Sequence, residues 1–239
     1  KLEFVFKFEF CHLKLSSTLS LSLYFFKYCD TIVNMETLFY LIILLFSVIL
    51  HEVAHGAVAY SLGDPTAKYE GRLTLNPISH IDPFGSILLP LIMLVATFGR
   101  GPIFGWAKPV PINPNNFRDL KHGDLKVAIA GPAVNFLIAI IFGLLIRFLP
   151  LSASSPLLVF FSIIVAQNLL LGVFNLIPIP PLDGHWILFS FLPEKFSNIK
   201  IALSQYGMFI LLFMVFFGFG WVISIVGFLF FLITGYRFF

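Results

Sequence analysis

The sequence predicts an all-α polytopic membrane protein with about five to six transmembrane helices, a short membrane-associated β-hairpin and a re-entrant segment. Of its 239 residues, 59% are hydrophobic and only 11% are charged, whereas soluble domains carry about 25% charged residues. Several apolar stretches approach the length that a helix needs to cross the roughly 30 Å of hydrocarbon in a bilayer. The net charge of +3 is small. It indicates no nucleic-acid surface, and the partner that the composition predicts is the lipid bilayer.

The predicted helices lie between breaker residues. The first runs from Glu36 to Leu62 and ends before the cluster Gly63–Pro65. The apolar stretch Gly85–Phe98 contains a proline and is short for a spanning helix, so we interpret it as re-entrant or tilted. Three later stretches are predicted to span, the last as two helices. They are Leu125–Leu149, Pro156–Ile177, and Ile201–Phe239 with a break at Phe217–Gly220.

Two segments between these helices have a different pattern. Lys68–Leu75 alternates polar and apolar side chains and is closed by Asn76 and Pro77, which predicts a strand or hairpin. An extended substrate could pair with its edge, or the hairpin could only cover the site. Gly99–Asp124 is rich in Gly, Pro and Asn and contains four basic residues. We expect this segment at the membrane surface.

The first 34 residues are set apart from the rest. The chain opens on Lys, and Met35 stands just before the first clearly hydrophobic helix. We therefore interpret residues 1–34 as an uncertain N-terminal extension, which need not be native, and residues 35–239 as one integral membrane domain. Cys11 and Cys29 lie in the extension without C-x-x-C spacing. They predict neither a disulfide framework nor metal ligands.

An H-E-x-x-H motif lies in the second half of the first predicted helix, at His51, Glu52 and His55. Residues four apart share one face of a helix, so both imidazoles can reach a single zinc ion. Glu52 then lies beside the ion and can accept a proton from water whose pKa the ion lowers toward ~7. The alternative is that helix neighbours satisfy all three side chains in a packed bundle. Three ionisable groups at membrane depth are costly, however, without a partner such as a metal.

Catalytic zinc usually has three protein ligands and a water, so a third ligand must come from another segment. The best candidate is Asp183, which follows the fourth apolar stretch within the segment Asn175–Gly184. Three prolines in this segment break the helix. Irregular backbone at membrane depth is tolerated only when it is buried in protein or lines a wet cavity. The alternative for Asp183 is an ordinary Asp-Gly turn.

Together the two motifs resemble the two signatures of the site-2 protease family of intramembrane zinc metalloproteases. H-E-V-A-H occupies positions 51–55, and N-L-I-P-I-P-P-L-D-G occupies positions 175–184. The similarity covers nearly everything from Met35 to about Phe191 and includes the segments Gly105–Val110 and Ala130–Asn135.

This resemblance implies one Zn²⁺ per chain, with His51, His55 and Asp183 as ligands and Glu52 as the general base. Asn175 matches the family asparagine that is thought to hold substrate or oxyanion. Interhelical hydrogen bonding is the alternative for Asn175, and equally for Asn135.

The chain also departs from well-known members of the family. Only Leu149–Pro156 separates the third and fourth spans, so the PDZ module that many relatives insert there is missing. The chain looks like the compact prokaryotic subgroup, and the missing module counts against carrying over regulation by prior cleavage. His185 stands where many relatives have Gly or Ser. We interpret it as facing solvent, with a hydrogen bond inside the site as the alternative.

We predict a zinc-dependent intramembrane endopeptidase that hydrolyses peptide bonds in or near transmembrane segments of membrane proteins. Its partners would be transmembrane protein or peptide substrates, and its oligomeric state stays open. We expect a multi-pass protein of the cell membrane with its active site toward the cytoplasm. The basic residues of Leu62–Lys126 would share one side with Lys195 and Lys200, whereas Leu151–Pro156 carries no charge.

Three other functions are compatible with the pattern. In another class of membrane zinc peptidase a glutamate completes the metal site, and Glu194 is the only glutamate after residue 125. A membrane transporter could use intramembrane charges for ion passage. A non-catalytic metal-binding membrane protein is the third, although it would have no need of Glu52.

Overall fold

A computed structural model of the chain describes residues 35–96, 107–152 and 155–237. Its contacts divide the chain into two compact units, one with Asn76–Pro109 and the residues up to Ile42, the other with Ile43–Leu75 and Val110–Phe239. The predicted N-terminal extension, both cysteines, and Gly105 and Trp106 of the family resemblance lie outside the described residues. The described residues form helices and turns and no strand.

The smaller unit contains the predicted re-entrant segment. The structure shows it as a π-helical turn, η2 (Pro83–Leu88), followed directly by α4 (Leu89–Ala96), after the 3₁₀ turn η1 (Pro77–His80). Asp82 begins η2 by accepting hydrogen bonds from the N–H groups of Phe84 and Gly85. Within the described residues the two elements together extend about 20 Å, less than the roughly 30 Å of a bilayer's hydrocarbon. Re-entry into the membrane stays a prediction.

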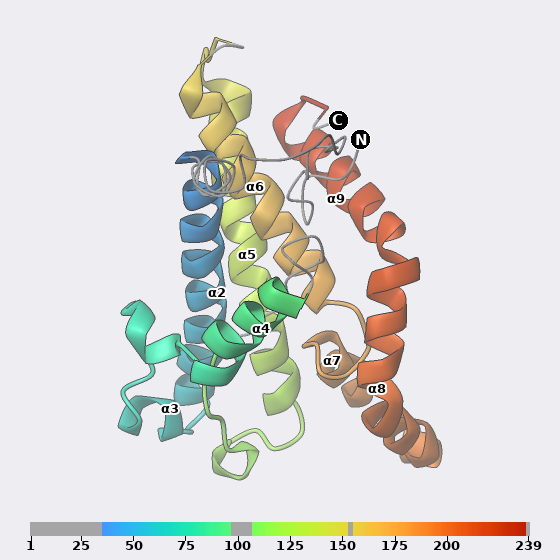
Figure 1. Ribbon diagram of the computed structural model, residues 1–239. Helices are drawn as coiled ribbons and strands as arrows, with labels where there is room; N and C mark the ends of the chain where they lie inside the picture. Colours follow the sequence, from blue (N-terminus) through green and yellow to red (C-terminus); the bar gives the residue numbers. More distant parts are fainter. Residues whose placement is uncertain (1–34, 97–106, 153–154, 238–239) are drawn as a thin grey trace, which may run out of the picture. The chain divides into compact units, whose positions relative to one another are not determined.

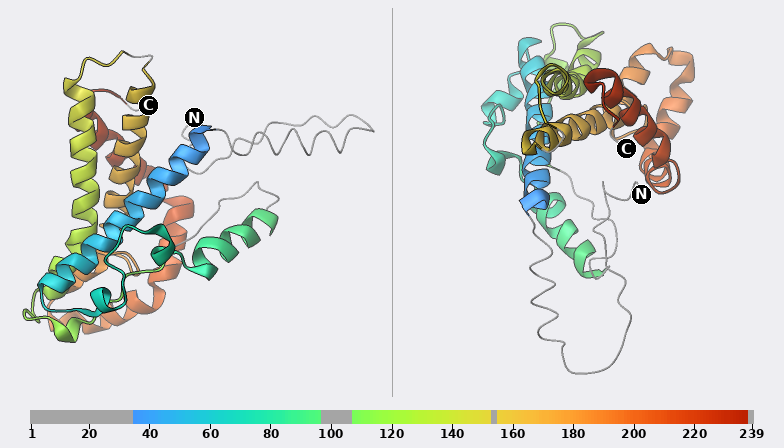
Figure 2. Two further views of the ribbon diagram at one scale, coloured as in Figure 1. Left: turned by 90° about the vertical axis from the view of Figure 1, so that its left-hand side faces the viewer. Right: turned by 90° about the horizontal axis from the view of Figure 1, so that it is seen from above.

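The larger unit contains the long helices (Figure 1). Helix α5 packs lengthwise on α6, and α9 packs on both of them. Figure 2 shows α5 and α6 running beside each other, with α2 crossing at an angle. The elements in chain order are α2 (Met35–Ser61, in this unit from Ile43), α3 (Thr66–Tyr69), η3 (Pro114–Asn116), α5 (Gly123–Phe148), α6 (Pro156–Asn175), α7 (Gly184–Phe191), η4 (Glu194–Phe196), α8 (Ser197–Phe217) and α9 (Phe219–Thr234).

Close contacts between small and large residues bring these helices together. A Cβ atom at Gly172 of α6 would lie 3.0 Å from the ring of Phe136 on α5, and one at Gly143 of α5 would collide with Ile233 of α9. Small residues of this kind let helices in lipid approach closely. The core that results is made only of apolar side chains from α5, α6, α8, α9 and the segment after α6. It includes Ala139, Ile146, Val165, Leu169, Val173, Ile177, Leu182, Leu211, Val222, Val226 and Phe230.

Within the described part of the chain, four helical segments are long and apolar enough to cross a membrane. They are Phe39–Ser61, Gly123–Phe148, Pro156–Asn175 and Glu194–Phe217, and the shorter apolar helix α9 follows them. A multi-pass membrane protein is therefore confirmed, and the helices lie where the apolar runs predicted them. The predicted total of five to six crossings is not established by these four.

The predicted hairpin at Lys68–Leu75 is wrong. The segment forms the single turn α3 and then a glycine turn, and its backbone hydrogen bonds are local: Arg72 N–H donates to the Ala67 carbonyl at 2.9 Å. Gly71 has a φ of +63°, which an extended strand does not use. The alternation does not mark a buried face, because Arg72 is buried whereas the apolar Tyr69 and Leu75 are exposed. The proposed substrate edge at this segment is therefore withdrawn.

Candidate metal centre

The two histidines of the motif lie on one face of α2, one helical turn apart. Both are buried, their ring centroids are 4.6 Å apart, and the two Nε2 atoms are 3.0 Å apart. The spacing of four residues makes this approach possible on an α-helix. Helix α2 thus presents two imidazole nitrogens at a single point.

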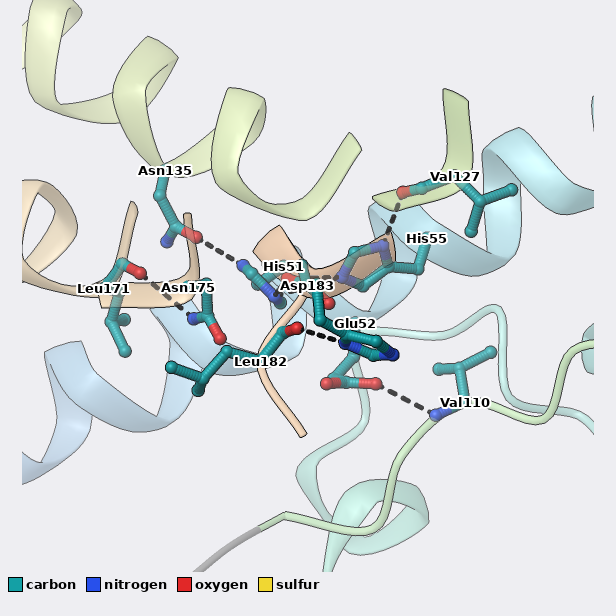
Figure 3. Close-up of polar contacts among 11 residues, drawn as sticks. His51, Glu52, His55, Val110, Val127, Asn135, Leu171, Asn175, Leu182 and Asp183 are labelled. Atoms are coloured by element: carbon teal, nitrogen blue, oxygen red, sulfur yellow. Dashed lines mark hydrogen bonds and ion pairs between the residues drawn. The ribbon is translucent and has the colours of Figure 1, made fainter. Parts of the chain in front are cut away.

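Asp183 reaches the same point from the connection between α6 and α7. Its Oδ2 atom lies 3.0 Å from Nε2 of His51 and 3.3 Å from Nε2 of His55 (Figure 3). One ligand atom from each of the three residues lies within 4.8 Å of the others. The structure therefore brings together the two motifs that are far apart in the sequence.

The second ring nitrogen of each histidine faces a hydrogen-bond acceptor. Nδ1 of His51 donates to Oδ1 of Asn135 at 2.6 Å, and Nδ1 of His55 donates to the Val127 carbonyl at 2.7 Å (Figure 3). An amide or carbonyl oxygen can only accept, so each Nδ1 carries the proton, and a neutral ring then has its lone pair on Nε2. Both nitrogens that face Asp183 are therefore of the type that binds metal.

The arrangement fits a zinc ion. Oδ2 of Asp183 is buried and has no hydrogen-bond donor among the described residues, and the two Nε2 lone pairs converge on it. Acceptor atoms about 3 Å apart repel one another, and a cation at the shared point satisfies all three at once. Two imidazole nitrogens and one carboxylate oxygen are ligands that catalytic zinc accepts, with a fourth position open.

The charge state of Asp183 agrees with this role. Burial raises the pKa of its carboxyl, but positive charge at the point that it shares with His51 and His55 lowers that pKa to about 2. Positive charge beside the carboxylate, supplied by a proton or by a metal ion, stabilises its ionised form. Asp183 is therefore an anionic ligand at neutral pH.

Helix α5 supports the site from one face. Val127, Gly131 and Asn135 are spaced by four residues and so lie in one row along the helix. The first and last accept the hydrogen bonds from the histidines. A Cβ atom at Gly131 would lie 2.4 Å from Nε2 of His55 and 2.6 Å from Nε2 of His51. Only glycine leaves this space free beside the ligand nitrogens.

Glu52 is half-buried and is held by the backbone of the segment that precedes α5. Its Oε2 atom accepts a hydrogen bond from the N–H of Val110 at 2.9 Å (Figure 3). One turn further along α2, a Cβ atom at Gly56 would lie 2.8 Å from the Val110 side chain. The absence of a side chain at Gly56 thus allows Val110 to approach Glu52.

Asp64 anchors the segment that carries Val110. It is fully buried just after α2. Its carboxylate accepts hydrogen bonds from the N–H and hydroxyl of Thr66 at 3.2 and 2.5 Å, from the N–H of Asn113 at 2.7 Å and from the side chain of Asn116 at 2.8 Å. Burial raises the pKa of Asp64, but these hydrogen bonds lower it below its ordinary value. We call this set the Asp64 clasp.

Comparison with known proteins assigns the family. Residues 149–215 match the profile of peptidase family M50. The chain is 42% identical over 181 residues to YwhC of Bacillus subtilis (strain 168), whose name places it among the zinc metalloproteases, and the match covers 72% of this chain and 78% of YwhC. The chain belongs to peptidase family M50. The site-2 protease resemblance is thereby confirmed, and this M50 peptidase is a membrane zinc metalloprotease.

Two further relatives of this M50 peptidase carry names of the same class. It is 35% identical over 162 residues to zinc metalloprotease MJ0392 of Methanocaldococcus jannaschii, covering 67% of this chain and 36% of that protein. It is 30% identical over 166 residues to Rip2 of Mycolicibacterium smegmatis, covering 68% and 61%. No solved structure matches the chain.

The position of Glu194 excludes the alternative in which a glutamate, in place of Asp183, completes the metal site. This glutamate lies exposed in η4, and among the described residues it is not part of the group that could hold an ion. The short connection Leu149–Ser155 between α5 and α6 has no room for a PDZ domain.

Asn175 lies at the C-terminal end of α6, half-buried, and its Nδ2 atom donates to the Leu171 carbonyl at 3.0 Å (Figure 3). It is not one of the three residues that converge on the metal position. Its predicted contact with substrate stays a prediction.

His185 does not simply face solvent. Its Nδ1 atom donates to the Leu182 carbonyl at 2.5 Å, and its ring contacts Trp186 and Phe189. This hydrogen bond ties the peptide next to Asp183 to the first turn of α7. It does not join His185 to any of the three metal-binding residues, so a hydrogen bond inside the site stays a prediction.

Three kinds of contact in this M50 peptidase were not predicted from the sequence. The supporting row on α5 could have been found, because Val127, Gly131 and Asn135 recur at a spacing of four. The Val110 N–H is a backbone group and has no residue-type signal. Asn168 of α6, which donates to Ser47 of α2 and accepts from Asn135, was visible only as one of two adjacent polar residues in an apolar run.

Proposed function

We propose that this M50 peptidase is an intramembrane endopeptidase that hydrolyses peptide bonds in or near transmembrane segments of membrane proteins. In this proposal His51, His55 and Asp183 hold one zinc ion per chain, and Glu52 is the general base. The observation that carries the proposal is the convergence of three metal-binding atoms from the α2 helix and the α6–α7 connection. Helix α2 is itself long and apolar enough to cross a bilayer, and the α6–α7 connection follows helix α6, which is also long and apolar enough.

A zinc ion bound there polarises the scissile carbonyl and lowers the pKa of the attacking water. The protein's own groups then handle the protons. Glu52, one residue after His51, accepts the proton of the attacking water and later delivers it to the leaving amine. The N–H of Val110 orients the carboxylate for this transfer by fixing one of its two oxygens, so the other oxygen is the one that exchanges the proton.

Asn175 is proposed to stabilise the oxyanion. Its side-chain amide has two N–H donors, and the Leu171 carbonyl takes one of them. The other can donate to a substrate oxygen, whose negative charge develops as the peptide bond is attacked. Asn175→Leu should lower kcat, and an unchanged kcat would leave Asn175 as an interhelical or intrahelical structural residue only.

Transmembrane proteins or peptides are the proposed substrates. A helix hides its carbonyls in internal hydrogen bonds, so a bound transmembrane segment must unwind before attack. Substrates with a helix-breaking Gly or Pro near the cleavage point should therefore be cleaved faster than uniformly helical ones. The comparison is a pair of model substrates that differ at that one residue.

The active site is proposed to face the cytoplasm of the cell membrane. In the larger unit, His55 lies in the second half of α2, Val127 lies near the start of α5 and Asp183 follows the end of α6. The chain around the start of α5 and after α6 carries several basic residues. They include Arg118, Lys121, Lys126, Lys195 and Lys200. Basic residues concentrate on the cytoplasmic side of membrane proteins. Labelling of a single cysteine introduced at Lys121 from outside intact cells would contradict this orientation.

Two variants test the proposed roles. Glu52→Gln should abolish cleavage of a model transmembrane substrate in detergent and leave about one zinc per chain, because the amide cannot accept the proton. Asp183→Asn should weaken zinc retention, because a neutral amide is a poor ligand. The matched controls are Glu70→Gln and Asp119→Asn, which lie outside the site and should change neither measurement. Cleavage by the Glu52 variant would reject Glu52 as the base, and full zinc content in the Asp183 variant would reject that ligand.

A further inference from the structure

Three polar side chains form a buried chain that leads from an apolar helix interface to His51. Asn135 of α5 and Asn168 of α6 are completely buried, and Ser47 of α2 is nearly so. Asn135 Nδ2 donates to Asn168 Oδ1 at 2.9 Å, and Asn168 Nδ2 donates to Ser47 Oγ at 3.0 Å. Each of the three residues comes from a different helix. We call Ser47, Asn168 and Asn135 the amide relay.

The hydrogen bonds of Asn168 set the orientation of its amide. Its Nδ2 donates to the Ile164 carbonyl at 2.9 Å as well as to Ser47, so both of its N–H groups are used. A carbonyl oxygen can only accept, and the reversed amide would set two oxygens against each other. Oδ1 of Asn168 must therefore point toward Asn135.

The orientation of the Asn168 amide determines the orientation of the Asn135 amide, which in turn determines the tautomer of His51. Because Asn168 presents an acceptor, Asn135 must present its Nδ2 group to it and turn its Oδ1 toward His51. That oxygen accepts the proton of Nδ1 and leaves the lone pair on Nε2, the atom that faces Asp183. With Asn135 reversed, Nδ1 would accept and Nε2 would carry the proton, so His51 could not bind a metal through that atom.

We infer that Asn168, supported by Ser47, is a positioning residue that selects the metal-binding tautomer of His51 through Asn135. Asn168 does not touch any of the three metal-binding residues in the structure, and it acts only through the relay. His55 needs no such device, because the Val127 carbonyl that fixes its tautomer cannot be reversed. The inference deepens the proposed zinc site, yet it does not require that the site cleave peptides.

The first test is the zinc affinity of the full-length protein in detergent, measured by competition with a chromophoric chelator. Asn168→Leu keeps the approximate volume but removes the acceptor, and the affinity should fall by roughly 10- to 100-fold, as for other residues that orient a metal ligand. Asn168→Asp keeps an oxygen acceptor for Asn135, and in its protonated form it can still donate, so it should recover most of the affinity. Thr234→Val is the matched control: Thr234 is a buried hydroxyl in α9 that donates to the Phe230 carbonyl, and its loss should leave zinc affinity unchanged.

The second test reads the tautomer directly. In metal-free protein labelled with ¹⁵N-histidine, with the His51 signals assigned by their loss in His51→Gln, wild type should show His51 protonated at Nδ1 alone. Asn168→Leu should show a mixture of the two tautomers, and Thr234→Val should match wild type. If Asn168→Leu does not fold, Ser47→Ala, which leaves the Ile164 contact in place, should show a smaller shift in the same direction.

The outcomes separate the relay from the proposed function. Wild-type zinc affinity and a single His51 tautomer in both the Asn168→Leu and Ser47→Ala variants would overturn the inference. Failure of the wild-type protein to cleave any transmembrane substrate would instead count against the proposed function, while zinc affinity could still respond to Asn168→Leu.

Discussion

The two halves of the site are held in different ways. The metal-binding half is built from side chains and carbonyls inside the helix bundle, with His51 and His55 supported from α5 and α6. The base, Glu52, accepts instead a hydrogen bond from the N–H of Val110, which lies in the segment before α5. The Asp64 clasp connects that segment to the end of α2. Different contacts therefore position the metal ligands and the base, although Glu52 directly follows His51 in the chain. We expect substitutions in one set to affect metal affinity and substitutions in the other set to affect proton transfer.

Gly131→Ala should have the largest effect, because it places a methyl group directly against the ligand nitrogens of both histidines. The added methyl group would lie 2.4 Å from Nε2 of His55, closer than any real contact. We expect a loss of zinc affinity on the order of 100-fold, together with loss of cleavage, measured by chelator competition and substrate assay. Gly220→Ala on α9, where a Cβ meets nothing, is the control. A variant that retains zinc at wild-type affinity would show that α5 does not confine the site.

Asp64→Asn should separate the two halves. The amide would place an N–H group where Asp64 now accepts hydrogen bonds from N–H and O–H donors. At least one of these hydrogen bonds would be lost, and the segment that carries Val110 would be held less firmly. We expect kcat to fall by about tenfold or more, because small displacements of a catalytic group are costly, while zinc stoichiometry stays at the wild-type level. Asp119→Asn serves as the matched control. Equal loss of zinc and of activity in the Asp64 variant would remove the distinction between the halves.

The pH dependence of stability should sharpen the same comparison. The pKa of Asp64 is lower in the folded chain than its ordinary value of 3.8. Its contribution to stability is therefore complete above that value and is lost as the pH falls through the lower folded pKa. The thermal midpoint of wild type should drop in this acidic range more steeply than that of Asp64→Asn. Parallel curves for the two proteins would mean that the clasp does not depend on the charge.

Arg147→Met should have the smallest effect, because Arg147 lies outside both halves. Its guanidinium donates to the Leu232 and Ile233 carbonyls at 2.9 and 3.4 Å, at the C-terminal end of α9. Cations at that end of a helix contribute up to about 1 kcal/mol at an exposed position. We expect a loss of that size in the free energy of unfolding, with unchanged zinc affinity and kcat. A change in kcat would reveal coupling between α9 and the site.

The parts that the sequence could predict are those set by local pattern. In lipid a chain must satisfy its backbone hydrogen bonds internally, so apolar runs become helices of nearly the same bounds: Pro156–Ile177 was predicted, and α6 is Pro156–Asn175. The approach of Asp183 to the H-E-x-x-H motif followed from the ligand number of zinc and from the prolines that end α6.

The parts that could not be predicted depend on contacts between distant segments. The turn at Lys68–Leu75 is the exception, because local hydrogen bonds and Gly71 set it although the segment alternates like a strand. Ser47 and Asn168 are polar residues within apolar runs, and only the packing of α2, α5 and α6 brings them into one relay. The contact between Glu52 and the Val110 N–H involves a group that every residue except proline carries.

The most direct measurement is zinc-edge X-ray absorption on the Glu52→Gln protein in lipid bilayers, compared with the same protein carrying Asp183→Asn. We expect the first sample to show a zinc ion with nitrogen and oxygen ligands only and with the outer scattering of two imidazoles. We expect an altered or lost ligand set in the second sample. A sulfur ligand, a single imidazole, or identical spectra from the two samples would contradict the proposed metal site.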